Sequence, residues 1–299
     1  MFFEVTPDSW LDVKKISDAL SSWIFRGHHD AKWPLITTIE RASEQFRCDR
    51  ELIWIREKML IRDFQRRAHH YISSPPATDE LLEWLTLVQH YGGPTRLLDF
   101  TYSFYIAAFF AVENAFTDSC IWAVNRLTLH RNVEKLFGTR WSEYPTLIEQ
   151  DAAVVKLAES YLSDRDKSLD FVLDVIPGRL NERNASQQGL SLFPCNMSKP
   201  FEANLCAALG LAFESLSQKN STPIETSKID DDFYLRASIL KINLPRKIHR
   251  DAYLDLHSMN IDAASLFLGL DGFARSLYYH LRVMEPSKKM EEYLKKSAG

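Results

Sequence analysis

The chain has 299 residues, of which 45% are hydrophobic and 12% aromatic, so it can bury a sizeable core and its composition argues against disorder. Its formal net charge of -4 argues against a protein whose whole surface binds nucleic acid through Lys and Arg, although a local basic cleft is compatible with it. Length alone fits either one large domain or two ordinary ones.

The four cysteines lie far apart and form no Cys-x-x-Cys pair. Because that spacing is typical of neither a zinc ribbon nor a dense disulfide framework, we expect reduced, buried thiols. The N-terminus lacks a basic leader, and no apolar run approaches the roughly 20 residues that a membrane helix needs. We therefore expect a cytoplasmic protein that does not enter the membrane.

Helical periodicity predicts a short amphipathic helix over residues 10–20, followed by a strand over residues 22–27. This strand places Arg26 at its end, where a side chain can reach a cleft. Residues 39–70 then show one long, charged helical pattern, and the interleaved Glu and Asp indicate a solvated face. A further helix begins near residue 78 and ends at the Gly92-Gly93-Pro94 turn.

Residues 95–100 are predicted to form a short strand or turn, and residues 103–115 an apolar helix of the kind that is normally buried. Further along the chain we expect strands at residues 120–124, 171–176, 187–193 and 233–242, helices at 128–137, 146–162, 201–216 and 245–259, and a flexible loop at 218–232. Residues 266–283 are expected to close the core. The pattern predicts a single α+β domain over residues 1–285, with short, mostly antiparallel strands among many helices, and a flexible tail over residues 286–299.

The densest polar chemistry lies between His90 and Ser103, immediately before the apolar helix. For His90 the alternative to a functional role is a histidine that binds the last carbonyls of its helix. Asp99 and Thr101 could equally cap the following helix. Arg26 and Arg96 stand in apolar contexts, so each is expected to bind either an internal carboxylate or an anionic ligand.

Several common kinds of site lack support in this sequence. The pairs His28-His29 and His69-His70 have no ligand spacing such as His-Glu-x-x-His, so no metal is expected. The Gly92-Gly93-Pro94-Thr95 turn is neither a P-loop nor a dinucleotide fingerprint. The sequence contains neither a Gly-x-Ser-x-Gly elbow nor a neighbouring Cys-His pair, so it does not indicate an acyl-transfer nucleophile.

The triplet Phe25-Arg26-Gly27, the block over residues 89–103 and the following Ala107-Ala-Phe-Phe-Ala111 together resemble the FRG domain family. This family is named after the Phe-Arg-Gly triplet and occurs widely in bacteria and their phages. Arg183 with Gln187-Gln188-Gly189 is similar to a third block, and residues 261–272 to a C-terminal one. The sequence departs from the family pattern at Phe100, where tryptophan is expected, and at Ser191, where an aromatic residue is expected.

A more distant resemblance is to ADP-ribosyltransferases of the arginine, Ser-Thr-Ser, glutamate type, and it implies NAD as the substrate. It also implies that Arg26 clamps a phosphate, that Thr101 or Ser103 fixes Arg26 and the nicotinamide ribose, and that His90 binds a ribose hydroxyl. Gly27 and Arg96 complete the implied nucleotide-binding set. Where the catalytic glutamate is expected, the chain offers Gln187 and Gln188, with Glu182 upstream and Asp99 as the other acid.

Two functions therefore remain open. The first is an ADP-ribosyltransferase-like enzyme that transfers ADP-ribose to a protein or nucleic-acid acceptor, or cleaves NAD, in toxin or phage-defence biology. The second is a non-catalytic module that binds a nucleotide or nucleic acid through Arg26, Arg96 and His90, and the missing glutamate favours it. The sequence makes no prediction about oligomeric state.

Overall fold

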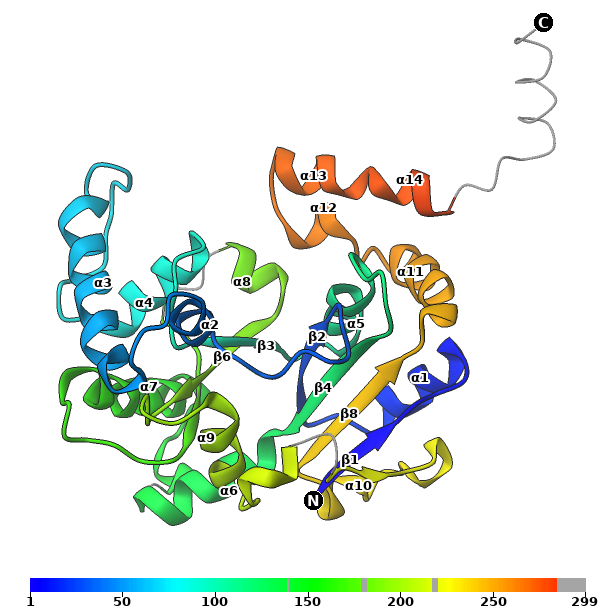
Figure 1. The fold of residues 1–299 in the computed structure, drawn as a ribbon, viewed down its shortest axis with the longest axis horizontal. Helices are drawn as coiled ribbons and strands as arrows, with labels where there is room; N and C mark the ends of the chain where they lie inside the picture. Colours follow the sequence, from blue (N-terminus) through cyan, green and yellow to red (C-terminus); the bar gives the residue numbers. More distant parts are fainter. Residues whose placement is uncertain (139, 179–181, 217–219, 284–299) are drawn as a thin grey trace, which may run out of the picture.

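A mixed sheet of eight strands forms the centre of the fold in a computed structural model that describes residues 1–138, 140–178, 182–216 and 220–283 (Figure 1). The strand order is β5-β6-β3-β2-β4-β8-β1-β7. The strands are β1 (Phe2–Val5), β2 (Trp23–His28), β3 (Leu98–Thr101), β4 (Ser119–Asn125), β5 (Val172–Val175), β6 (Gly189–Pro194), β7 (Thr222–Pro223) and β8 (Ile239–Leu244). Among the described strands only β1 pairs in parallel, with β7 and β8, so the predicted α+β fold with mostly antiparallel strands is confirmed.

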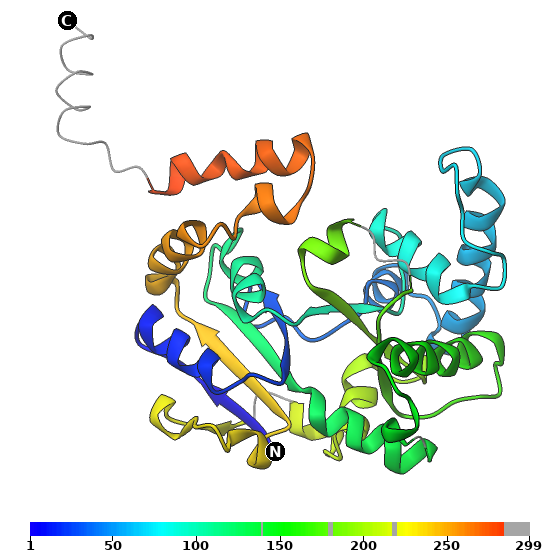
Figure 2. The ribbon, with the colours of Figure 1, turned by 180° about the vertical axis from the view of Figure 1, so that it is seen from behind.

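Helices cover both faces of this sheet (Figures 1 and 2). One face packs against α3 (Ile53–Ala68), α4 (Leu81–His90), α6 (Arg126–Phe137), α7 (Leu147–Ser163) and α9 (Phe201–Ala208). The other packs against α1 (Trp10–Asp18), α5 (Phe104–Val112), α10 (Phe233–Arg236), α11 (His249–Ser258) and α12 (Ala263–Leu266). Ile24 and Phe25 are both buried although they point to opposite faces, as expected for a strand covered on both sides.

The remaining helices lie at the edges of these layers. They are α2 (Thr38–Gln45), α8 (Glu182–Ser186), α13 (Leu270–Ser276) and α14 (Tyr278–Val283). Short 3-10 turns occur at η1 (Arg50–Leu52), η2 (Trp141–Glu143), η3 (Phe213–Leu216), η4 (Thr226–Lys228) and η5 (Arg246–Ile248).

The apolar helix α5 crosses directly over β2, and Gly27 makes this possible. A Cβ atom at Gly27 would lie 2.1 Å from the Ala107 carbonyl oxygen and 2.5 Å from the Ala111 nitrogen. Only glycine therefore allows the helix backbone to approach the strand this closely. The glycine of the Phe-Arg-Gly triplet thus sets the position of α5 relative to Arg26.

The predicted long helix over residues 39–70 is wrong, because the chain turns sharply between α2 and α3. Arg47 adopts a left-handed conformation with φ of 52°, and the Cys48 N–H donates to the Ser43 carbonyl. Asp49 then caps η1 by accepting from the Glu51 N–H. Because of this break, α2 and α3 are two separate helices that run in different directions.

Other boundaries also differ from the prediction. The helix expected over residues 201–216 ends at Ala208, because Gly210 has a φ of 67° and the chain continues into η3. The strand expected over 233–242 starts later, since α10 precedes β8. The predicted loop 218–232 contains β7 and η4, and β1 was not predicted at all.

The C-terminal helices α12, α13 and α14 lie above α5 and α11 in Figure 1. Leu266 is buried, but Leu270, Phe273 and Leu281 are exposed. The prediction that residues 266–283 close the core is therefore wrong for most of this segment. The predicted tail over residues 286–299 lies outside the described residues.

Three of the four cysteines are buried and free, as predicted, whereas Cys48 is partly exposed. In the part of the chain that the structure describes, no helix is both long and apolar enough to cross a membrane. The described residues also contain no group of three or more His, Cys, Asp or Glu side chains that could hold a metal ion.

Candidate functional site

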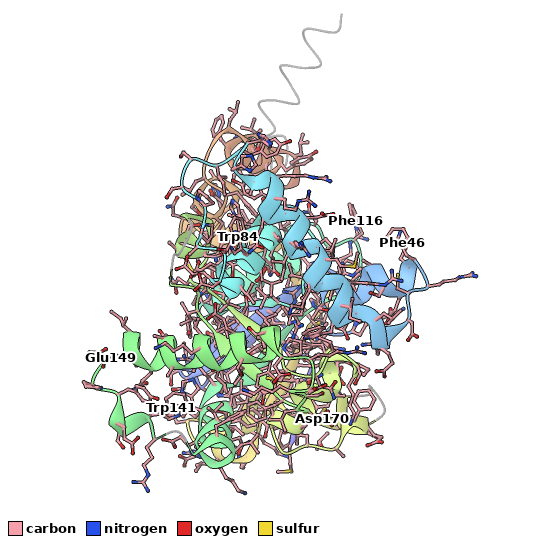
Figure 3. The ribbon with its side chains drawn as sticks, turned by 90° about the vertical axis from the view of Figure 1, so that its left-hand side faces the viewer. Phe46, Trp84, Phe116, Trp141, Glu149 and Asp170 are labelled. Atoms are coloured by element: carbon pink, nitrogen blue, oxygen red, sulfur yellow. The ribbon has the colours of Figure 1, made fainter. Side chains whose placement is uncertain are left out.

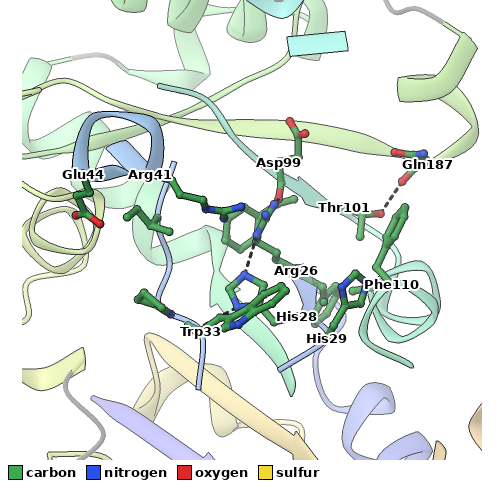
Figure 4. A pocket seen from close by; sticks show the side chains of 16 residues that line it. Arg26, His28, His29, Trp33, Arg41, Glu44, Asp99, Thr101, Phe110 and Gln187 are labelled. Atoms are coloured by element: carbon green, nitrogen blue, oxygen red, sulfur yellow. Dashed lines mark hydrogen bonds between the residues drawn. The ribbon is translucent and has the colours of Figure 1, made fainter. Parts of the chain in front are cut away.

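A pocket of about 600 Å³ opens between the end of β2, the loop that follows it, α2, β3 and α5. Figure 4 shows the polar and aromatic side chains that face it. The lining residues are Phe25, Arg26, Gly27, His28, His29, Trp33, Pro34, Ile36, Arg41, Glu44, Asp99, Phe100, Thr101, Ala107, Phe110 and Gln187.

Arg26 extends from β2 into this pocket and is held by two uncharged acceptors. Its Nε donates to Nε2 of His28 at 3.1 Å, and its Nη1 donates to the backbone carbonyl oxygen of Asp99 at 2.6 Å. Among the described residues Nη2 donates no hydrogen bond, and no carboxylate forms an ion pair with this guanidinium. The side chain is thus fixed in place while its positive charge is not neutralised by direct contact.

His28 lies two residues from Arg26, on the same face of β2, and its protonation state follows from its partners. Because Arg26 can only donate, Nε2 of His28 must accept, so the proton resides on Nδ1, which lies 3.3 Å from the Trp33 carbonyl oxygen. Burial, together with the charge of Arg26, lowers the pKa of His28 to about 3. His28 is therefore neutral near pH 7 and links Arg26 to the Trp33 loop.

Arg41 provides a second guanidinium at the pocket. It projects from α2, is exposed and forms no ion pair with any described residue. Figure 4 shows its side chain extending from α2 toward Arg26. Desolvation lowers the pKa of Arg26, the charge of Asp99 opposes this effect, and the charge of Arg41 lowers the pKa further. An anion between the two arginines would relieve both their repulsion and their incomplete hydrogen bonding.

The pocket also has an aromatic wall. Trp33 is 47% exposed, and the rings of His28 and His29 lie edge-on to it, with centroids at 6.2 and 5.9 Å. Phe110 of α5 lines the pocket and packs edge-on against Phe267 at 5.9 Å. An exposed indole beside two guanidinium groups is a suitable surface for a flat ring attached to an anion.

Among the lining residues that the structure describes, two are acids, and they differ in orientation. The Asp99 carboxylate accepts from Nε2 of Gln89 at 2.5 Å and from the Ser191 hydroxyl at 2.9 Å. Figure 4 shows it on the side of β3 away from Arg26, so only its backbone contacts the arginine. Glu44, one helical turn after Arg41, lies 3.6 Å from Nη2 of Arg50.

Five of the predicted site residues line the pocket: Arg26, Gly27, Asp99, Thr101 and Gln187. The Thr101 hydroxyl donates to the Gln187 carbonyl at 2.7 Å and accepts from the Ser103 N–H at 3.0 Å. The Gln187 side-chain amide donates to the Leu266 carbonyl at 3.0 Å. Thr101 and Gln187 thus fasten β3 and the C-terminal helices to the pocket wall.

The other four predicted residues lie outside its lining. His90 ends α4, with its ring edge-on to Tyr91 at 4.9 Å, and Ser103 caps α5 by accepting from the Ile106 N–H. Gln188 is exposed with φ of 47°. Arg96 is fully buried and paired with Glu57, which is the internal carboxylate that its apolar context suggested. The side chains of Glu182 and Arg183 lie outside the described residues.

Sequence reasoning missed His28, Trp33, Arg41 and Glu44 as members of this pocket. The position of His28 could have been predicted, because residues two apart on a strand share a face, which places it beside Arg26. The sequence did not indicate that Arg41 and Glu44 line a pocket, since the charges of their helix are typical of a solvated face. Their contribution depends on where α2 lies, and contacts with distant parts of the chain hold it there, such as the Phe201 N–H that donates to the Glu40 carboxylate at 2.9 Å.

The fold and this pocket define an α+β protein with an arginine-bearing cavity at the end of a central strand. The chain contains an FRG domain, because residues 21–120 match the model of that domain. The match covers Arg26, Trp33, Arg41, Asp99 and Thr101, and ends within β4. Comparison with curated proteins and with solved structures gave no significant match for this chain.

Proposed function

We propose that the pocket binds a nucleotide, with NAD as the ligand, through a phosphate held by Arg26 and Arg41 and a ring stacked on Trp33. The observation that carries this proposal is that, within the described part of the chain, Arg26 donates hydrogen bonds only to neutral acceptors, His28 and the Asp99 carbonyl. A desolvated guanidinium without a carboxylate partner favours an anionic ligand.

The phosphate position follows from the two arginines. Neither Nη2 of Arg26 nor the Arg41 guanidinium donates a hydrogen bond to a described residue. An anion that contacts both therefore gains several charge-assisted hydrogen bonds. Phosphate oxygens suit guanidinium groups because two parallel N–H donors match two oxygens. A pyrophosphate would span the two side chains better than a single carboxylate, which supports a dinucleotide.

The remaining lining supports a base and a ribose. The exposed face of Trp33 offers a stacking surface, and the pocket volume of about 600 Å³ lies within the range of about 300 to 1,000 Å³ that is typical of ligand sites. His29 and Gln187 line the same pocket and add polar groups within reach of ribose hydroxyls. Binding of this kind requires no catalytic acid.

Cleavage of NAD or transfer of its ADP-ribose is a second candidate, and Glu44 is the observation that favours it. In that reaction the bond between C1′ of the ribose and the nicotinamide nitrogen breaks, and nicotinamide leaves with the bonding electron pair. A water or acceptor nucleophile adds to C1′ and loses its proton. Glu44 supplies a carboxylate at the same pocket, where it would stabilise the developing positive charge on the ribose.

Isothermal titration calorimetry with NAD, ADP-ribose and AMP tests the binding proposal directly. We expect Arg26→Gln to weaken NAD binding about 10- to 100-fold, the loss expected for a charge-assisted hydrogen bond, while Arg131→Gln, an exposed arginine on α6, leaves it unchanged. Absence of binding for all three nucleotides would overturn the proposal.

Chromatographic detection of nicotinamide then separates binding from turnover. Release of nicotinamide by the wild-type chain that is abolished in Glu44→Gln, with NAD affinity retained, supports the enzymatic candidate. Binding that is lost in Arg26→Gln without any nicotinamide release, with water or with added protein and nucleic-acid acceptors, restricts the function to binding.

A further inference from the structure

The outer surface of α3 is strongly basic, because the acids that accompany its cations in the sequence do not neutralise it in the fold. Glu57 is buried and faces inward to pair with Arg96. Asp63 is the other acid of this helix, and it is exposed. The exposed cations of α3 are Arg56, Lys58, Arg62, Arg66 and Arg67.

An apolar groove of about 510 Å³ lies along the C-terminal half of this helix. Figure 3 faces this side of the molecule and shows α3 crossing it, with Trp84 of α4 beside it. Tyr71 and Tyr91 stand 85% and 64% exposed at the groove. The groove is lined by Leu60, Asp63, Phe64, Arg67, Ala68, Tyr71, Ile72, Val88, Tyr91, Gly93 and Pro94.

Three residues of the distinctive Gln89 to Ser103 block, Tyr91, Gly93 and Pro94, line this groove and not the arginine pocket. Gly93 lies directly on Val88, since a Cβ atom there would be 2.5 Å from Val88 Cγ1. Its N–H is already used, donating to the Val88 carbonyl at 2.8 Å, and Pro94 has no N–H. The groove floor thus offers an apolar surface without free backbone donors at these two positions.

This geometry selects a helical partner over an extended one. Strand addition requires the unpaired edge of a sheet, whereas the two edge strands here, β5 and β7, belong to other parts of the fold, and α3 and α4 form the groove walls. A helix satisfies its own backbone and presents an apolar stripe at the i, i+3, i+4 and i+7 positions.

We propose that this groove docks an acidic amphipathic helix of a protein partner, independently of nucleotide binding in the arginine pocket. The apolar stripe would insert between Tyr71 and Tyr91, and acidic residues on its flanks would face Arg66 and Arg67. Nucleic acid fits less well, because Arg67 is the only cation among the lining residues that the structure describes, whereas most of the lining is apolar and suits an apolar stripe.

Selection from a displayed library of 16-residue helical peptides, with all faces randomised, tests this surface on the full chain. Peptides with a Leu or Phe stripe flanked by Glu and Asp should be enriched. Fluorescence anisotropy should show about a 30-fold weaker affinity of the selected peptide for Tyr91→Ala, the size expected for an aromatic anchor. Arg26→Gln should leave peptide affinity unchanged.

Charge reversal provides the sharpest control. Arg66 and Arg67 are exposed, so the double variant Arg66→Glu with Arg67→Glu should fold normally, as its thermal midpoint will show, and should reverse the selected flanks from acidic to basic. An unchanged consensus, or no enriched peptide, overturns the proposal. Binding of a labelled single-stranded oligonucleotide that needs these arginines, or concentration-dependent self-association that Tyr91→Ala abolishes, would assign the groove to nucleic acid or to a second copy instead.

Discussion

Two arginines with similar sequence surroundings have different environments in this fold. Arg96 donates through Nε to Glu57 at 2.6 Å, pairs with the same carboxylate through Nη2 at 2.5 Å, and lies over the Phe193 ring at 4.9 Å. Its own N–H donates to Glu57 at 2.9 Å. Arg26 instead contacts a neutral imidazole and a backbone carbonyl.

Arg96 is fully buried and Arg26 is partly exposed, but the charge of the acceptor is the difference that decides which arginine is available to an anionic ligand. Glu57 neutralises Arg96 and links α3 to the segment just before β3. Because the pair has no net charge, it does not attract an anion. Arg26 is held by two hydrogen bonds, but no described carboxylate pairs with its charge. The pair should therefore respond to mutation mainly in stability, and Arg26 mainly in affinity.

The largest effect is expected from breaking the buried pair. Glu57→Ala leaves Arg96 charged and unpaired in the interior, so the free energy of unfolding should fall by about 3 to 5 kcal/mol in urea denaturation. Glu51→Ala, an exposed glutamate of η1, is the matched control and should change it by less than about 0.5 kcal/mol. A loss below about 1 kcal/mol for Glu57→Ala would contradict the structural role of the pair.

The opposite behaviour is expected at Arg26. Because desolvation lowers the pKa of its guanidinium and no described carboxylate contacts it directly, Arg26→Gln should leave the free energy of unfolding of the unliganded protein within about 1 kcal/mol or raise it. Differential scanning fluorimetry should show that NAD raises the thermal midpoint of the wild type but not of this variant. A strongly destabilised Arg26→Gln would remove the contrast with Arg96.

The fold class could be predicted from the sequence because the helical and the strand periodicity of hydrophobic residues are both strong in this chain. The buried strand β4 and the apolar helix α5 followed directly from their residue patterns. The break between α2 and α3 did not, since the left-handed Arg47 has no glycine or proline to mark it. The parallel strand β1 is only four residues long, and its pairing with β8 joins distant parts of the chain.

The candidate site was predictable to a similar degree. Arg26 and Gly27 follow from their place at the end of β2, and Asp99 and Thr101 from the adjacent strand β3. The direction of the Asp99 carboxylate could not be predicted, because the strand pleat decides which face each side chain takes. The partner of Arg96 could not either, since Glu57 lies 39 residues away in the chain.

A pH effect of intermediate size should come from His28. Its pKa of about 3 in the folded protein lies below the ordinary value of 6.5, so below pH 6.5 the unfolded chain binds a proton that the folded protein does not. Acid therefore destabilises the wild type through this group, by up to about 1.4 kcal/mol per pH unit between pH 6 and 4.

His28→Gln keeps an acceptor for Arg26 and a donor for the Trp33 carbonyl but cannot titrate. Urea denaturation at several pH values should therefore show a shallower acid dependence for this variant than for the wild type. His69→Gln, which removes an exposed histidine at the end of α3, controls for the loss of an imidazole. Equal slopes for His28→Gln and wild type would show that His28 is protonated in the folded protein, which would place a second charge beside Arg26.

The smallest effect is expected at Arg41, which shares the proposed anion with Arg26 from a solvent-exposed position. Because its charge is screened by water and salt, Arg41→Gln should weaken NAD binding only about 3- to 5-fold at low ionic strength, and less in 0.5 M salt. The Arg26→Gln deficit should persist in salt, since that guanidinium is desolvated. Calorimetry at two salt concentrations separates the two. Equal, salt-insensitive losses would mean that Arg41 closes onto the ligand and becomes as dehydrated as Arg26, so that α2 and not β2 alone would define the bound state of the pocket.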